Sequence, residues 1–255
     1  MPETIYALVD YDNQRPPRFG SKARSGRPPS LRDHEDYLHI LINAILDLRG
    51  QFSDAFLELR LRLYGGWTSL LPDERSEVGD IVSSAVANWG RTSRTRRTRL
   101  FVELADALLV APEELLVGTF RATRWRGATL RFFPQPPECK EGPGCSHIKA
   151  LLDWSRGRCP RRPSCPVHST QVASSEGQKL VDAMLICDTI SAATHLGAHV
   201  LTVSMDDDVI PGVLSAHLLG GRVSLVRFGK RDPSVLDPVL ARNGVNIIDL
   251  PSLGG

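Results

Sequence analysis

The chain has 255 residues, 42% of them apolar and 24% charged, with a formal net charge of +2. These fractions are those of an ordinary water-soluble globular protein, long enough for one domain with an insertion. They exclude a membrane-spanning class, because no apolar run approaches the roughly 20 residues of a membrane helix, and residues 1–11 lack a signal-peptide pattern. We therefore expect a cytoplasmic protein, in which five cysteines argue against a disulfide framework.

The two ends of the chain alternate apolar strands with amphipathic helices. Short apolar or alternating runs such as IYALVD at residues 5–10 indicate strands, and apolar residues at every third or fourth position indicate helices. Strands that alternate with helices imply a parallel sheet covered on both faces. The predicted strands cover residues 5–10, 55–64, 198–204, 221–228 and 245–249, and the predicted helices cover residues 31–48, 73–89, 179–195 and 207–219.

The middle of the chain does not follow this rhythm. Residues 100–110 could form a strand or a helix, and residues 115–121 and 128–133 are typical of short strands. We therefore treat residues 91–170 as an insertion into a domain formed by residues 1–90 and 171–255.

Acidic side chains follow the predicted strands at the place where open α/β folds keep their sites. The strand at residues 198–204 runs into Asp206, Asp207 and Asp208, and the first strand ends in Asp10. The carboxyl ends of parallel strands meet at one edge of a sheet, so these acids should approach one another. Clustered carboxylates repel one another unless a cation offsets their charge, and Mg²⁺ or Mn²⁺ prefers oxygen ligands. The sequence therefore predicts a divalent-metal site, with Asp207 facing away from it.

Four motifs in this order resemble the NYN branch of the PIN-like nucleases. They are VDYDN at residues 9–13, RLYGGW at residues 62–67, KLVDAMLICD at residues 179–188, and the strand with SMDDD at residues 201–208. The match covers both ends of the chain and leaves the middle unexplained. The resemblance implies a three-layer α/β/α sandwich with a central, mostly parallel sheet. It also implies metal-dependent hydrolysis of phosphodiester bonds, usually in RNA.

The resemblance also implies which residues form the site. Asn13 would be an amide beside the metal, and Lys179 would contact phosphate or be an ordinary exposed lysine at a helix start. Asp182 and Asp188 are six residues apart, about 600° around a helix, so both cannot point at one spot. Asp182 is favoured, and Asp188 is kept as a cofactor-binding candidate. The implied catalytic and metal-binding residues are Asp10, Asp182, Asp206 and Asp208.

Two departures from the family pattern keep a second interpretation open. Met205 stands where a glycine is usual before the first acid of the turn, and Val209 stands where an aromatic residue is common. The chain could then be a catalytically degenerate protein of this type that binds nucleic acid or regulates another factor. A phosphatase is a third interpretation, but the basic segments favour a polymeric substrate.

Two arginine-rich segments suit a phosphate backbone. One runs from Arg15 to Arg27 with five basic residues and no acid, and the other runs from Arg91 to Arg99. Solvated linkers without a partner are the alternative interpretation. We expect nucleic acid, above all RNA, as the partner, and proteins of this family also pair with copies of themselves or with other factors. The candidate nucleic-acid contacts are Arg91, Arg94, Arg96, Arg97 and Lys179.

Four of the five cysteines fall in a block, residues 139–168, that is rich in glycine, proline and arginine. They form two equally spaced pairs, and a histidine follows each pair. Tetrahedral Zn²⁺ takes four ligands from converging turns, so this block predicts a structural zinc module. A Cys₄ site is the first choice; a histidine in place of one cysteine, and cysteines without a metal, are the alternatives. The candidate ligands are Cys139, Cys145, Cys159 and Cys165, with His147 or His168 as substitutes. The fifth, Cys187, lies on an apolar helix stripe and is expected in the core.

Overall fold

The computed structural model describes residues 3–11, 29–48, 57–68, 74–89, 98–117, 119–124, 150, 153, 174–178, 180–229 and 234–252. The chain divides into two compact units. One is formed by Met1–Phe120 with Gln178–Gly255, and the other by Arg121–Gly177. Within the described residues, no helix has both the length and the apolar character needed to cross a bilayer.

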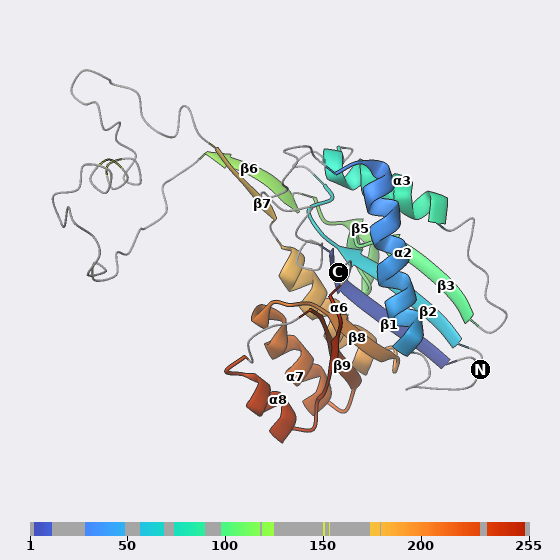
Figure 1. Cartoon of the computed structure of the whole chain (residues 1–255). Coiled ribbons are helices and arrows are strands. Elements are labelled where there is room, and N and C mark those ends of the chain that lie inside the picture. Colours follow the sequence, from blue (N-terminus) through green and yellow to red (C-terminus); the bar gives the residue numbers. More distant parts are fainter. Residues whose placement is uncertain are drawn as a thin grey trace, which may run out of the picture. The chain divides into compact units, whose positions relative to one another are not determined.

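Six parallel strands form the sheet of the first unit (Figure 1). Their order across the sheet is β10-β9-β8-β1-β2-β3. This arrangement confirms the predicted α/β class with a parallel sheet. The strands are β1 (Glu3–Asp10), β2 (Leu57–Tyr64), β3 (Thr98–Leu104), β8 (His199–Val203), β9 (Arg222–Phe228) and β10 (Asn246–Leu250).

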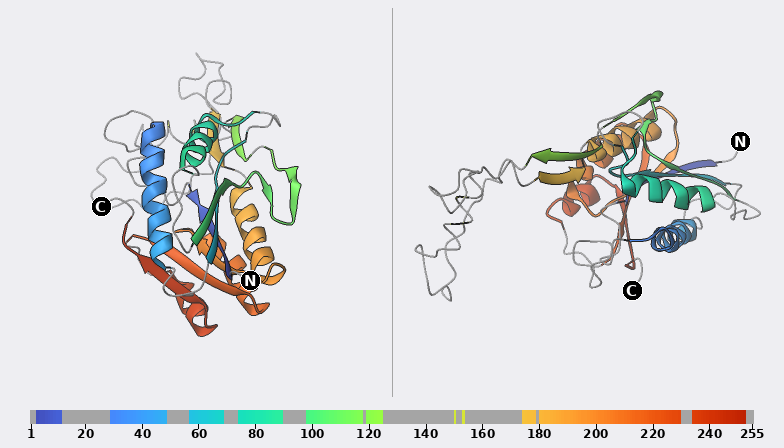
Figure 2. Two further views of the ribbon diagram at one scale, coloured as in Figure 1. Left: turned by 90° about the vertical axis from the view of Figure 1, so that its right-hand side faces the viewer. Right: turned by 90° about the horizontal axis from the view of Figure 1, so that it is seen from above.

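Helices pack on both faces of this sheet and enclose a separate apolar core on each. Along β1, Ile5, Ala7 and Val9 belong to one core, while Tyr6 and Leu8 belong to the other. This alternation is the period of two that a strand imposes on its side chains. The first core is covered by α2 (Leu31–Asp47) and α3 (Glu77–Trp89), and the second by α6 (Val181–Thr194), α7 (Ile210–Leu218) and α8 (Asp237–Arg242). Figure 2 shows α2 and α6 on opposite sides of the strands.

The strand order reverses between β1 and β8. The chain runs outward from β1 through β2 to β3, then returns and runs outward in the other direction through β8, β9 and β10. In open α/β sheets such a reversal leaves a crevice at the carboxyl ends of the two central strands, where ligands bind. The expected acidic residues of β1 and of the turn after β8 therefore fall at the switch point.

Residues 98–104, which the sequence analysis placed in the insertion, form the edge strand β3 of the sheet. A hairpin of β4 (Ala107–Leu108) and β5 (Ala111–Leu115) follows it, and β6 (Phe120–Arg124) pairs with β7 (Ser174–Gln178). Residues 115–121 were expected to form one strand. Instead, β5 ends at Leu115 and β6 begins at Phe120. Cys187 is exposed rather than buried, so its expected place in the core was wrong.

Buried aromatic side chains support the carboxyl ends of β1 and β2. Tyr11, Tyr37 and Trp67 are fully buried, and the Tyr11 ring contacts both of the others. The Tyr11 hydroxyl is 2.7 Å from Nδ1 of the buried His34, while the Trp67 indole donates to the Leu63 carbonyl. The turn after β2 thereby closes over the first core and holds the strand ends that carry the site.

Candidate active site at the carboxyl edge of the sheet

Asp10 and Ser204 join the two central strands at the switch point. Asp10 ends β1, and Ser204 directly follows β8; both are fully buried. The register pairs Val9 with Val203, which sets these two residues side by side. The Ser204 hydroxyl donates to Oδ2 of Asp10 at 2.9 Å and accepts the backbone N–H of Asp206 at 3.0 Å. One hydroxyl therefore holds the β1 carboxylate and the start of the acidic turn together.

Asp206 also organises its own turn. It is the N-cap of the short 3₁₀ helix Asp207–Val209, and its Oδ1 accepts the backbone N–H of Asp208 at 3.0 Å. An acidic cap is favourable here because the first N–H groups of a helix have no other partner. Asp208 is exposed and Asp206 is partly buried, so both carboxylates border solvent at this edge.

Asp207 points to a different part of the fold, as the sequence predicted. Its Oδ2 accepts the Ser234 hydroxyl at 2.8 Å, and its Oδ1 is 4.0 Å from Nη2 of the buried Arg227. The same guanidinium binds Oδ1 of Asp237 at 2.7 Å. The middle acid of the run therefore ties the turn to β9 and to the start of α8.

Asp182 brings a further carboxylate from the first turn of α6. Partial burial raises the pKa of this carboxyl, and the negative charges of Asp206 and Asp208 raise it further. Three acids from two elements thus lie close enough to influence one another's ionisation. Leu180, immediately before the helix, has a φ of 68°, the left-handed region that residues other than glycine avoid.

Asp188 occupies a buried polar network instead of the acidic edge. Its Oδ2 accepts the Tyr64 hydroxyl at 2.6 Å, and its Oδ1 accepts the Leu109 backbone N–H at 2.7 Å. Nε of Arg62 lies 3.4 Å from the same carboxylate, and its Nη1 binds Glu103 at 2.6 Å. Burial raises the pKa of Asp188, although the hydrogen bonds from Tyr64 and Leu109 and the charge of Arg62 oppose the rise. With both oxygens bonded, Asp188 fastens α6 to β2 and to the residues after β3.

The described carboxylates supply the right donor atoms for Mg²⁺ or Mn²⁺, but they are not gathered around one point. Among the described residues, no group of three or more His, Cys, Asp or Glu side chains is arranged closely enough to hold a metal ion. Mutual repulsion between like charges favours such a spread arrangement. These residues therefore suit a divalent cation by their oxygen atoms and by their position at the sheet edge. The described residues do not form a preassembled metal site.

Several predicted residues fall outside the described part of the chain. These are Asn13, Lys179, the zinc candidates Cys139, Cys145, Cys159, Cys165, His147 and His168, and the arginines Arg91, Arg94, Arg96 and Arg97.

Sequence reasoning did not assign a role to Ser204 or to Arg227. Ser204 was visible as the polar residue that ends an apolar strand, but its bond to Asp10 depends on the strand order. Arg227 lies near the end of the apolar strand β9, and only the fold brings Asp207 and Asp237 to it. Neither pairing has a sequence signal, since the partners are contributed by separate elements.

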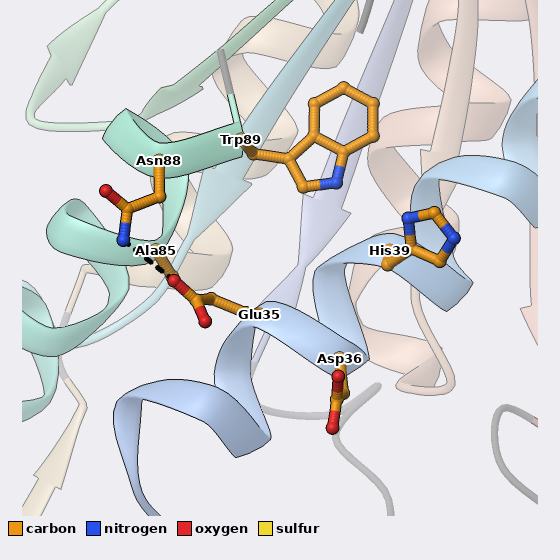
Figure 3. A pocket seen from close by; sticks show the side chains of 6 residues that line it. All are labelled: Glu35, Asp36, His39, Ala85, Asn88 and Trp89. Carbon is orange, nitrogen blue, oxygen red and sulfur yellow. Dashed lines mark hydrogen bonds between the residues drawn. The ribbon is translucent and has the colours of Figure 1, made fainter. Parts of the chain in front are cut away.

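A groove of about 290 Å³ lies between α2 and α3 (Figure 3). Asn88 donates to Oε1 of Glu35 across it at 2.7 Å. Both helices cover the first core, whereas the alternation along β1 directs Asp10 to the opposite face of the sheet. The groove is therefore separate from the acidic edge. Its lining residues are Glu35, Asp36, His39, Ala85, Asn88 and Trp89.

Comparisons with protein-family models, with curated proteins and with solved structures found no match to this chain.

Proposed function

We propose that this chain is a divalent-metal-dependent ribonuclease with a PIN-like three-layer sandwich of the NYN type. The observation that carries the proposal is that acids of β1, α6 and the turn after β8 lie along the carboxyl edge of the sheet, where Ser204 bonds both the Asp10 carboxylate and the backbone of Asp206. The raised pKa of Asp182 beside Asp206 and Asp208 supports it, because clustered negative charge is a reason to bind a cation. The proposed catalytic and metal-binding residues are Asp10, Asp182, Asp206 and Asp208.

The chain's own residues would prepare the site. Bound Mg²⁺ or Mn²⁺ would neutralise charge on the phosphodiester and make a water nucleophilic. Ser204 would hold the carboxylate of Asp10 in one orientation, since its hydroxyl donates to that side chain. The cap formed by Asp206 would keep the acidic turn in place. Asp182 would supply a carboxylate from the facing helix, whose position is set by the bonds of Asp188.

The first prediction concerns the two acids that the central strands contribute. Replacing Asp10→Asn together with Asp206→Asn should lower Mn²⁺-dependent cleavage of RNA by at least about 100-fold, because both metal-binding charges are lost while hydrogen bonding is conserved. Cleavage is measured over a panel of single-stranded and structured RNA and DNA with Mg²⁺ or Mn²⁺. Circular dichroism verifies the fold of the variant.

Asp207→Asn is the matched control. It removes one charge from the same run, but from a side chain that binds Ser234 and lies near Arg227. It should cleave RNA at close to the original rate. Undiminished cleavage by the double variant would show that these acids are not the site.

A catalytically degenerate protein that binds nucleic acid is the second candidate. The carboxylates in the described residues do not converge on a metal position, and Met205 occupies the turn between Ser204 and Asp206. Absence of cleavage by clean protein with either metal, together with retained binding of RNA, would favour this candidate.

The remaining predicted groups fit the same proposal. Arg91, Arg94, Arg96, Arg97 and Lys179 would contact the nucleic acid, and Asn13 would lie beside the metal. We also propose a cytoplasmic location, where reduced cysteines are free to bind zinc. The zinc module would then order an insertion through Cys139, Cys145, Cys159 and Cys165, with His147 or His168 as substitutes.

A further inference from the structure

On the face of the sheet that bears Asp10, side chains in the first halves of β2 and β3 are exposed. On this face α6 packs against β1, β8 and β2, while β3 lies at the edge of the sheet. The register aligns Tyr6 with Arg60 and Arg60 with Phe101, so these three side chains form a row across β1, β2 and β3. Arg99 lies two residues before Phe101 and shares its face. Arg60, Arg99 and Phe101 are all exposed.

Two guanidinium groups lie close to the ring of Phe101. The guanidinium carbon of Arg60 is 5.1 Å from the centre of the Phe101 ring, and that of Arg99 is 5.0 Å from it. The Arg60 guanidinium is also 5.8 Å from the ring of Tyr6. Phe101 nevertheless keeps 38% of its surface exposed, whereas Tyr6 is buried. Phe101 thus presents an aromatic ring to solvent beside the exposed side chains of Arg60 and Arg99.

The charges on this surface are unevenly paired. Nε of Arg60 donates to Glu58 at 2.7 Å, so its charge is largely offset. Glu103, on the same face, is paired with Arg62. Arg99 has no ion-pair partner within the part of the chain that the structure describes. Among the described residues, the Arg99 guanidinium therefore has no carboxylate to offset its charge beside the exposed ring.

We propose that Phe101, Arg60 and Arg99 form a stacking surface for the bases of single-stranded nucleic acid, with Arg99 contacting a phosphate. Aromatic rings and guanidinium planes both stack on bases, and a base must be unpaired and unstacked to reach them. A duplex offers no such face to a flat sheet, so single strands are the substrate class that this surface fits. Arg91, Arg94, Arg96 and Arg97 precede Arg99 in the chain and add basic charge to the same segment of sequence.

This surface lies on the same face of the sheet as Asp10. Tyr6 and Asp10 share one face of β1 and are four residues apart, about 13 Å along the strand. Phe101 lies two strands away from β1, about 10 Å across the sheet. The diagonal from Phe101 to Asp10 is roughly 16 Å. A role of this surface in holding the substrate rests on the proposed ribonuclease function. Its binding of single-stranded nucleic acid does not depend on that function.

The test measures binding without catalysis. Fluorescence anisotropy of labelled single-stranded RNA, single-stranded DNA and duplex is followed with the full chain in a buffer without Mg²⁺ or Mn²⁺ and without a chelator. Phe101→Ala should weaken binding of the single strands roughly tenfold, because one stacking platform is lost. Phe101→Tyr keeps an aromatic ring and should bind within about twofold of the original. Arg99→Gln should weaken binding and reduce its dependence on salt by about one phosphate contact.

Leu115→Ala is the matched control, since it truncates a side chain that is 60% exposed on β5 and not part of the row. It should leave binding unchanged, and thermal unfolding confirms that each variant is folded. Unchanged affinity of Phe101→Ala would overturn the proposal. Loss of a dimer on Phe101→Ala with unchanged affinity would also overturn it and would identify the face as an interface between copies. Because the buffer contains no Mg²⁺ or Mn²⁺ for cleavage, failure of the ribonuclease proposal leaves this measurement unaffected.

Discussion

The carboxylate of Asp182 is destabilised by its surroundings. Partial burial raises its pKa, and the neighbouring charges of Asp206 and Asp208 add to the effect. An unperturbed aspartate has a pKa of about 3.9, so the folded chain holds this proton more tightly than the unfolded chain does. The free energy of unfolding therefore falls as pH rises from about 3.9 through the raised pKa. Residues kept for a site often reduce stability in this way.

Replacing Asp182→Asn should consequently raise the melting temperature at pH 7, by about 2 °C once solvent screening of this exposed side chain is allowed for. The gain should shrink as pH falls and vanish below about pH 3, where the carboxyl is protonated in both states. A series of thermal unfolding curves from pH 3 to pH 8 tests this. Asp36→Asn, which removes an exposed charge on α2, is the control. A variant less stable than the original chain at pH 7 would contradict the expectation.

The residues of the site divide into those that a sequence can reveal and those that it cannot. Asp10 and the acidic turn were identified because acids that end apolar strands are visible without a structure. The role of Ser204 depends on which strand lies beside β1, and that choice is made by the strand order. Asp188 resembled a site residue in sequence, yet its bonds to Tyr64 and Leu109 are formed inside the protein.

Among the elements, α6 begins under backbone strain. Leu180 has a φ of 68°, and no side chain caps the helix N-terminus that follows. The left-handed conformation costs an L-residue roughly 1–2 kcal/mol, and strained positions tend to cluster at functional sites. Leu180 lies two positions before Asp182. The strained backbone is therefore in the same turn that places the Asp182 carboxylate at the sheet edge.

Two substitutions at this position separate strain from packing. Leu180→Ala removes most of the side chain but retains Cβ, whereas Leu180→Gly removes Cβ as well. We expect the glycine variant to be more stable than the alanine variant by about 1 kcal/mol, because only glycine adopts this φ without a penalty. Urea unfolding of both variants gives the difference. Equal stability, or a more stable alanine variant, would show that Leu180 is not strained.

The elements that the sequence predicted well are those buried on both faces or strongly amphipathic. The predicted helix at residues 31–48 corresponds to α2 at Leu31–Asp47, and the predicted strand at 221–228 to β9 at Arg222–Phe228. β3 was ambiguous because one of its faces carries Arg99, Phe101 and Glu103, which a covered parallel strand would not. α8 was missed because its six residues are too few for a helical period to be recognised.

At the scale of the whole molecule, the two cores of the first unit are built from the two ends of the chain. Among the described residues, the buried side chains of both cores and the partly buried ones packed on them come from positions before 121 or after 177. The connection from β3 to β8 carries the chain from one edge of the sheet back to its centre, where the strand order reverses. An insertion in that long connection is tolerated because it disturbs no strand pairing. The irregular spacing of apolar residues indicated an insertion. The residue at which the insertion begins could not be predicted, because it depends on β3 being a strand of the sheet.

A shortened chain tests this independence and the proposed zinc module together. Replacing residues 125–173 with a turn of about four residues connects the neighbouring strands β6 and β7 directly. The first unit should remain folded, with a melting temperature within a few degrees of the original, because neither core loses any of its described residues. Elemental analysis, on protein purified without a metal-chelating tag, should find about one zinc per full-length chain and none in the shortened one, since four thiolates satisfy a tetrahedral site. A full-length chain without zinc would reject the module, and an unfolded shortened chain would show that the sheet depends on the insertion.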